Sequence, residues 1–397
     1  MPVARRSRTL PLTALLLVGA ACGGGRAPAP APEPVPDVVR IDVVPESLRA
    51  APDLPMPVVQ PRADTPRAWN DLDTTAARIP LLVATTRNYV NADWPGDRYG
   101  TIDANALSWA IARVNVPSYG QRAEGLITRA TAGGTPDGAT QMFIASLIPG
   151  DSIRFVQRLR DDLATTRSRD ILVFVHGYNS SFEDAAVRLA QITADMGFDG
   201  TAVLFAWPSQ GALSGYVRDQ QTARNAGWHL LRLLHDILPR ANPDRIHVVA
   251  HSMGSEVLSK AFSLVDPRDS LPRLGQVVFA APDVDARIFG REILPIIRQR
   301  AQGVTLYASS EDEALRASRV LNGVWRLGLG GDSLTVLDGM TTIDATRVRG
   351  DLLGHTLFGN SALLSDLHAV LTEGRGPGER RLLQVRRADG AVFWRFR

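Results

Sequence analysis

Short, mostly apolar runs alternate with longer amphipathic stretches from about residue 78 onward. Most of these runs lack the polar–apolar alternation of a strand with one solvated face, so we predict strands that are covered on both faces. The predicted strands are residues 80–84, 110–116, 171–175, 202–206, 246–250, 276–280 and 304–308.

The stretches between these runs predict helices over residues 182–196, 215–238, 253–265, 286–298 and 311–321. Ser180 or Ser181 is placed to cap the first of these helices, and Pro239 is placed to end the second. Strand–helix repetition predicts a mostly parallel central sheet with right-handed crossovers, an α/β fold with helices on both faces. Residues 380–397 predict a hairpin that turns at Asp389-Gly390.

The first 21 residues have a different character, with a basic start, an apolar run over 10–21 and small residues just before Cys22. The run is too short to span a bilayer as a stable helix, and this order predicts an export signal. It resembles a bacterial lipoprotein signal, which implies that Cys22 is lipidated and becomes the mature N-terminus. The alternative is ordinary signal cleavage that leaves a free thiol. We expect an exported protein of the cell envelope, anchored to the membrane through its N-terminal lipid.

Proline and alanine dominate the next segment, and residues 28–66 hold 11 of the 26 prolines. Such a segment favours extended polyproline conformations and cannot form a packed core, so we expect a linker. The predicted organisation is a signal peptide at 1–21, a linker at 22–77, an α/β domain at 78–375 and a C-terminal tail at 376–397.

Composition and charge exclude several classes of function. A single cysteine excludes an intrachain disulfide and a cysteine-rich zinc site. Without the three arginines at positions 5, 6 and 8, the 44 basic residues become 41 and equal the 41 acidic ones, so we expect no nucleic-acid partner. Neither a metal-binding histidine spacing nor a glycine-rich phosphate loop with lysine is present, so we expect no metal and no cofactor.

Ser252 stands where the predicted strand 246–250 passes into the predicted helix 253–265. The sequence Ala250-His251-Ser252-Met253-Gly254 places small residues on both sides of this serine, as a sharp strand-to-helix turn requires. The same pattern of small residues around a serine occurs at residues 106–110. There it leads into a predicted strand instead of following one, so it does not predict a strand-to-helix turn. The alternative role for Ser252 is a helix N-cap.

With this turn, the chain resembles the α/β-hydrolase superfamily, and more narrowly a bacterial family of esterase- and lipase-like α/β hydrolases of poorly defined function. Residues 84–88, 175–179, 205–209, Gly215-Tyr216 and Asp219 match as well. The resemblance covers roughly residues 78–375. It implies the α/β-hydrolase fold, hydrolysis of an ester or related acyl bond, and a triad in the chain order serine, acid, histidine.

The resemblance makes Ser252 the nucleophile and requires a histidine base after it. His355 and His368 are the only histidines beyond residue 252. His355 lies in a glycine-flanked loop before a further predicted helix over residues 363–371 and is the expected base. A capping or surface role is its alternative. His368 lies on that helix, where a surface histidine is expected.

Two acidic residues follow strands after Ser252. Asp312 is the expected triad acid, because the superfamily most often takes its acid after the second strand beyond that of the serine. Asp283 or Asp285 is the alternative. The structural role of Asp312 would be to stabilise a helix N-terminus, and that of Asp283 to form a turn or cap.

In this fold two backbone N–H groups stabilise the oxyanion. One is expected from Met253, the other from Tyr178, with Gly177 allowing a close approach and the His176 side chain bracing the loop. The expected function is a serine hydrolase, a carboxylesterase or lipase-like enzyme that forms an acyl-enzyme on a small-molecule or lipid ester. An acyltransferase, thioesterase or amidase with the same triad, and a non-catalytic envelope lipoprotein, are the alternatives. No oligomeric state is predicted.

Overall fold

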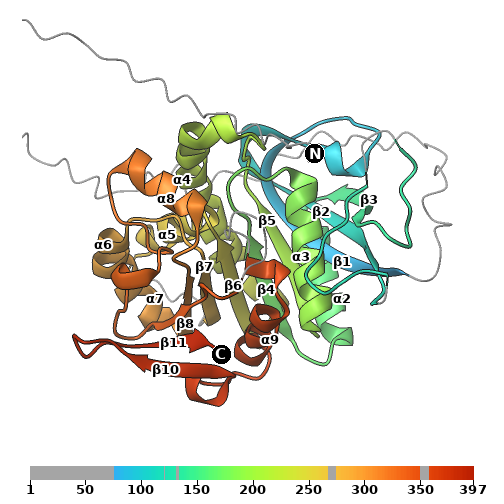
Figure 1. The fold of residues 1–397 in the computed structure, drawn as a ribbon. Coiled ribbons are helices and arrows are strands. Elements are labelled where there is room, and N and C mark those ends of the chain that lie inside the picture. Colours follow the sequence, from blue (N-terminus) through green and yellow to red (C-terminus); the bar gives the residue numbers. More distant parts are fainter. Residues whose placement is uncertain (1–75, 120, 131–133, 267–273, 349–356) are drawn as a thin grey trace, which may run out of the picture. The chain divides into compact units, whose positions relative to one another are not determined.

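A computed structural model describes residues 76–119, 121–130, 134–266, 274–348 and 357–397. In this part of the chain an 11-stranded sheet has the order β10-β11-β9-β8-β7-β6-β4-β5-β1-β2-β3 (Figure 1). The strands are β1 (Ala76–Tyr89), β2 (Tyr99–Pro117), β3 (Phe143–Gly150), β4 (Asp170–Val175), β5 (Thr201–Ala206), β6 (Arg245–His251), β7 (Leu274–Ala280), β8 (Ala301–Ala308), β9 (Thr341–Asp344), β10 (Leu382–Arg386) and β11 (Val392–Phe396). All neighbours from β1 to β11 in this order are parallel, whereas β10–β11, β1–β2 and β2–β3 are antiparallel pairs.

Helices cover both faces of this sheet, as the strand–helix repetition predicts. The helices are α2 (Ser152–Thr165), α3 (Phe182–Met196), α4 (Tyr216–Arg232), α5 (Gly254–Ser263), α6 (Ala286–Ile288), α7 (Leu294–Arg300), α8 (Glu313–Asn322) and α9 (Ser361–Leu371). Apolar residues of α3 and α9 form one buried cluster, and those of α2, α4, α5 and α7 form another. No helix within the described ranges is both long and apolar enough for a membrane span.

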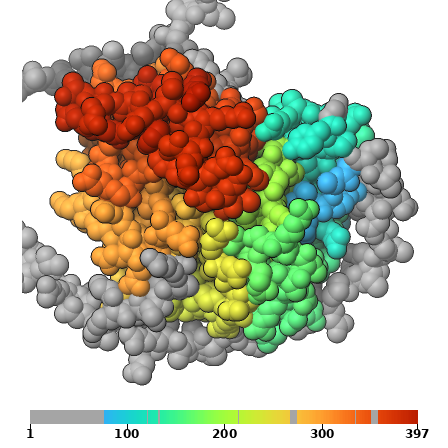
Figure 2. Space-filling view, turned by 90° about the horizontal axis from the view of Figure 1, so that it is seen from below, coloured from blue at the N-terminus to red at the C-terminus, as the bar shows by residue number. Residues whose placement is uncertain are grey.

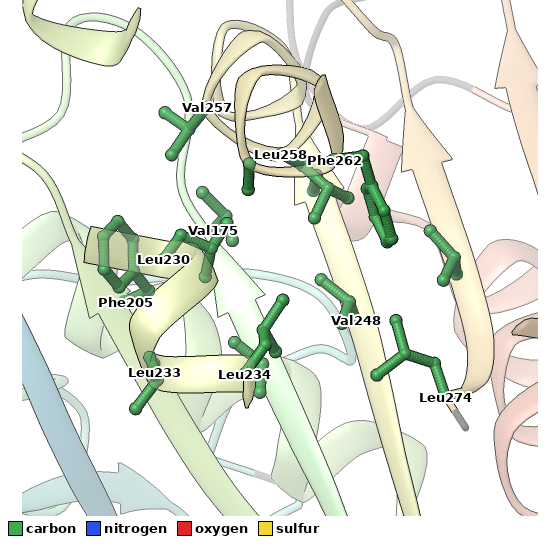
Figure 3. Packing of buried hydrophobic residues seen from close by; sticks show 14 of the residues in the cluster. Val175, Phe205, Leu230, Leu233, Leu234, Val248, Val257, Leu258, Phe262 and Leu274 are labelled. Atoms are coloured by element: carbon green, nitrogen blue, oxygen red, sulfur yellow. The ribbon is translucent and has the colours of Figure 1, made fainter. Parts of the chain in front are cut away.

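The strand β4 shows why the predicted runs are apolar throughout. All six of its residues are buried. Val173 and Val175 join one cluster, whereas Leu172 and Phe174 join the other. Figure 3 shows the first cluster, in which Val175 packs among side chains of the neighbouring strands and of the helices above them.

Two predicted helices are interrupted. The expected helix 215–238 is α4 followed by a π-helical turn, Leu233–Ile237, and a 3-10 turn, Leu238–Ala241. The expected helix 286–298 is α6, a π-helical turn, Phe289–Ile293, and then α7. In both, a proline follows the π-helical turn by two residues (Pro239 and Pro295). A proline removes one i→i−4 hydrogen bond and clashes with the preceding turn, which accounts for the change of helix type.

The hairpin predicted at the C-terminal end is confirmed, with Arg386 paired to Val392 across the turn. Its second strand also pairs in parallel with β9, where Trp394 lies opposite Ile343. The C-terminal residues consequently pack on the rest of the domain, as the red surface in Figure 2 shows. The elements β3, α2 and β9 were not predicted from the sequence.

Candidate active site

Ser252 lies in the sharp turn between β6 and α5, at the edge where the parallel strands end. Its φ of 52° falls in the left-handed region, which is uncommon for a residue with a side chain. The turn is held from β7 and the loop after it: the Ser252 N–H donates to Ala280 O at 3.0 Å, and Ser252 O accepts from the Asp283 N–H at 3.2 Å. A backbone of this kind costs about 1–3 kcal/mol and persists only where its surroundings fix it.

Gly254 permits the close approach of α5 to the end of β4. A Cβ at this position would lie 2.5 Å from Val175 O. The packing of helix against strand therefore requires glycine at position 254, and the helix N-terminus is brought to the serine.

The loop after β4 lies directly against Ser252. A Cβ on Gly177 would be 2.8 Å from Ser252 Cβ and 3.0 Å from His251 Nδ1. The adjacent Tyr178 is held through its side chain, whose hydroxyl donates to Ala212 O at 3.0 Å. On the other side of the serine, the Met253 N–H donates to no acceptor within the described residues. The loop after β4 therefore packs directly on the turn that holds Ser252.

The His176 side chain supports the loop after β4, as predicted from the sequence. Its buried ring stacks on Trp207, with ring centroids 5.1 Å apart. Its two ring nitrogens lie 2.8 Å from Gly177 O and 3.0 Å from Trp207 O. Burial, together with the charge of Arg87, lowers the pKa of His176 to about 3, so the ring is neutral at ordinary pH.

Arg87, at the end of β1, ties several loops of this edge together. Its side chain is fully buried, and burial lowers its pKa to about 10, which leaves it charged at neutral pH. The guanidinium donates to three backbone carbonyls, those of Gly100 at 2.9 Å, Ser180 at 2.7 Å and Ser209 at 3.2 Å. Arg87 lies in one of the segments that match the superfamily, but no role for its side chain was predicted from the sequence.

Asp219 of α4 holds the loop after β5, to which Arg87 also donates. Its buried carboxylate accepts from Ser209 Oγ at 2.6 Å and from the Gln210 N–H at 2.9 Å. The separate segments that match the superfamily in the sequence are therefore neighbours in space, and they support the loop beside Ser252.

Asp283, the alternative triad acid, lies in a buried ion pair. Its Oδ1 accepts from Arg326 Nε at 2.6 Å, and both side chains are 4% exposed. The same carboxylate accepts from Ser318 Oγ at 2.5 Å and from Tyr216 Oη at 2.7 Å. Burial and the Asp283 charge raise the pKa of Tyr216 to about 12. These contacts fasten α4 and α8 to the loop after β7.

Asp312, the expected acid, is fully buried after β8. Its Oδ1 caps α8 by accepting from the Leu315 N–H at 2.9 Å, so the helix-stabilising role is present. The loop before it is joined to the residues after β9, because the Ser310 N–H donates to Thr346 Oγ1 at 3.0 Å. Asp285 caps α6 by accepting from the Arg287 N–H at 2.8 Å.

His355 and Cys22 lie outside the described residues. Phe358, three residues after His355, packs edge-on against His251, with ring centroids 5.5 Å apart. His368 lies on α9, with Nδ1 2.8 Å from Met196 O at the end of α3. In the part of the chain that is described, no three histidine, cysteine or acidic side chains are grouped to hold a metal ion.

The sheet order, the helices on both faces and the serine turn define an α/β-hydrolase fold. The chain belongs to the family described as alpha/beta hydrolase of unknown function (DUF900), whose model matches residues 152–374.

Solved structures that match this chain at low similarity include the following three. The putative cell surface hydrolase from Lactobacillus plantarum WCFS1 is 11% identical and has a TM-score of 0.31, over 54% of this chain and 96% of its own. A lipase-esterase related protein from Clostridium acetobutylicum ATCC 824 is 10% identical with a TM-score of 0.26, over 54% and 93%. Trichoderma reesei cutinase, in complex with a phosphonate inhibitor, is 11% identical with a TM-score of 0.26, over 56% and 89%. No curated protein matches the chain.

Proposed function

We propose that this protein is a serine hydrolase of the carboxylesterase or lipase type, with Ser252 as its nucleophile. The observation that carries the proposal is the position of Ser252 in a left-handed turn at the N-terminus of α5, against the loop that contains Gly177. The side chain is only 3% exposed, and the turn places its hydroxyl at the N-terminus of a helix, where backbone N–H groups can stabilise negative charge.

In the proposed reaction His355 accepts the proton of Ser252 as the oxygen attacks the carbonyl carbon of an ester. The Met253 and Tyr178 N–H groups stabilise the tetrahedral oxyanion. The alcohol leaves with the proton from His355, and water, activated by the same histidine, then releases the acid and regenerates the serine. Asp312 holds His355 in the tautomer that the reaction requires.

Two observations support the choice of Asp312 as the acid. Asp283 is already neutralised by Arg326 and shared with two hydroxyls, so its charge is committed to the fold. The segment that holds His355 is bounded by Thr346, bonded to the loop before Asp312, and by Phe358, packed beside the serine turn. Three residues reach at most about 10 Å, so a histidine three residues before Phe358 is within chain reach of Ser252.

Hydrolysis of 4-nitrophenyl esters of increasing acyl length tests the proposal, with matched thioester and anilide substrates alongside. We expect the wild type to cleave esters, and Ser252→Ala and His355→Ala to fall to the background rate with unchanged circular dichroism. Preference for the thioester or anilide would assign the same triad to another acyl bond. Failure of the folded wild type to cleave any of them, or an active Ser252→Ala, would contradict the proposal.

Export and anchoring are part of the proposal and rest on the sequence before the domain. We propose that Cys22 carries the lipid that holds the protein in the cell envelope. The mass of the N-terminal peptide from the membrane fraction tests this, and Cys22→Ser should abolish the mass increment of the lipid. An unmodified wild-type peptide would refute lipidation.

A further inference from the structure

Three aliphatic side chains extend into solvent where the first turn of α4 meets the last turns of α8. Val217 is 77% exposed, Val320 is 82% exposed and Leu321 is 69% exposed. The two helices are joined between these side chains, because Asn322 Nδ2 donates to Tyr216 Oη at 3.0 Å. Figure 1 shows α4 and α8 side by side.

This surface lies at the same edge of the sheet as Ser252. The hydroxyls of Tyr216 and Ser318 donate to the Asp283 carboxylate from α4 and α8 respectively. The Asp283 N–H in turn donates to Ser252 O. The two helices that carry the exposed aliphatic side chains are thus both bonded to the buried Asp283, which is bonded to the serine turn.

The surroundings of the aliphatic side chains are basic. Arg218 and Arg319 are both exposed, and neither forms an ion pair with a described residue. Arg319 lies over the Trp325 ring, 4.1 Å from its centroid, which orients the guanidinium. The nearby acidic side chains are committed elsewhere: Glu313 pairs with Arg316, and Asp219 and Asp283 are buried.

We propose that the α4–α8 face, defined as Val217, Arg218, Arg319, Val320 and Leu321, docks on an anionic lipid surface. Aliphatic side chains enter the boundary of the acyl chains, and flanking arginines bind the negative headgroups. Charge complementarity favours this partner over a second copy of the chain, because two copies of the face would bring four unpaired arginines together. Docking through this face turns the edge that carries Ser252 toward the membrane, and it does not depend on catalysis.

The test uses a fluorophore at one position of the full chain. Because Cys22 is the only cysteine, Cys22→Ser combined with Val320→Cys directs an environment-sensitive label to the face alone. The matched control is Ile153→Cys, a position that is 79% exposed on α2, well separated from α8 in Figure 1. Labelling reports the face that touches lipid even if the N-terminal segment also binds the vesicles.

With vesicles of phosphatidylcholine and phosphatidylglycerol, we expect the label at 320 to shift to the blue and to be quenched by brominated lipid. The label at 153 should do neither. Arg218→Gln and Arg319→Gln should each reduce the shifted fraction about five-fold at limiting lipid, which corresponds to about 1 kcal/mol per basic side chain. An unshifted label at 320, or equal shifts at both positions, would overturn the proposal. A blue shift that depends on protein concentration without vesicles would assign the face to self-association instead.

Discussion

Gly177 lies so close to the serine that a Cβ at this position would come within 2.8 Å of Ser252 Cβ. Gly177→Ala should therefore displace the loop that we propose as the source of an oxyanion donor and lower kcat about 10²–10³-fold, as the loss of one donor does elsewhere. Steady-state kinetics on the best ester will measure it. Gly150→Ala is the matched control, because its Cβ would meet nothing closer than Arg154 Cβ at 3.9 Å. Equal kcat in both variants would show that the loop does not take part.

The two candidate acids can be separated at the residue scale. Asparagine caps a helix as well as aspartate, so Asp312→Asn should leave α8 intact while kcat falls about 10⁴-fold. Asp151→Asn, at the equivalent cap of α2, should keep full activity. Asp283→Asn should instead lower the free energy of unfolding by about 3–5 kcal/mol, because it leaves Arg326 buried and unpaired. A stable, inactive Asp283→Asn beside an active Asp312→Asn would reverse the assignment.

His176 makes the stability of the fold sensitive to acid. Its pKa is about 3 in the folded protein and 6.5 ordinarily, so the unfolded chain binds the proton first as the pH falls. The contribution of His176 is complete above pH 6.5 and is lost from there down to pH 3, by up to about 1.4 kcal/mol per pH unit. Urea unfolding of the wild type should lose more stability on acidification than that of His176→Gln. His235→Gln, at a half-exposed side chain, serves as the control. Parallel pH curves for the wild type and His176→Gln would contradict this.

At the scale of elements, the C-terminal hairpin is part of the sheet and contributes to its core. Phe396 is 6% exposed and stacks on the fully buried Tyr307, with ring centroids 6.3 Å apart. Phe396→Ala should cost about 3–5 kcal/mol of stability in urea unfolding. Leu383→Ala on the same hairpin should cost less than about 1 kcal/mol, because its side chain is 44% exposed. Equal costs would mean that the hairpin does not pack on the domain in solution.

Sequence patterns predict well those elements in which every residue has the same surroundings, such as strands that are buried on both faces. The strands β4, β5 and β6 are apolar because both faces are covered, and Ser181 caps α3 through a capping box. The interruptions before Pro239 and Pro295 were not predicted, because the apolar pattern continues through them. The strands β3 and β9 were missed as well, and β9 is only four residues long and takes its place through pairing with distant segments.

At the scale of the whole molecule, a local motif predicts the position of Ser252, but not the residues that hold the site together. Arg87 donates to carbonyls of segments more than 90 residues away in the chain, and no local pattern signals such a buried arrangement. The ion pair of Asp283 with Arg326 is of the same kind, since it depends on how the loop after β7 meets the segment after α8. Sequence order leaves Asp312 and Asp283 as candidate acids, and the buried contacts of Asp283 support the proposal of Asp312.

The central claim is that Ser252 is an activated nucleophile. The most direct measurement is to treat the full chain with a fluorophosphonate, which forms a covalent bond with an activated serine, and to locate the adduct by intact mass and peptide mapping. We predict a single adduct on Ser252, absent from Ser252→Ala and strongly slowed in His355→Ala, whereas Ser108→Ala at the other sequence match is labelled like the wild type. A folded wild-type protein that takes up no fluorophosphonate, or takes it up at another serine, would contradict the claim.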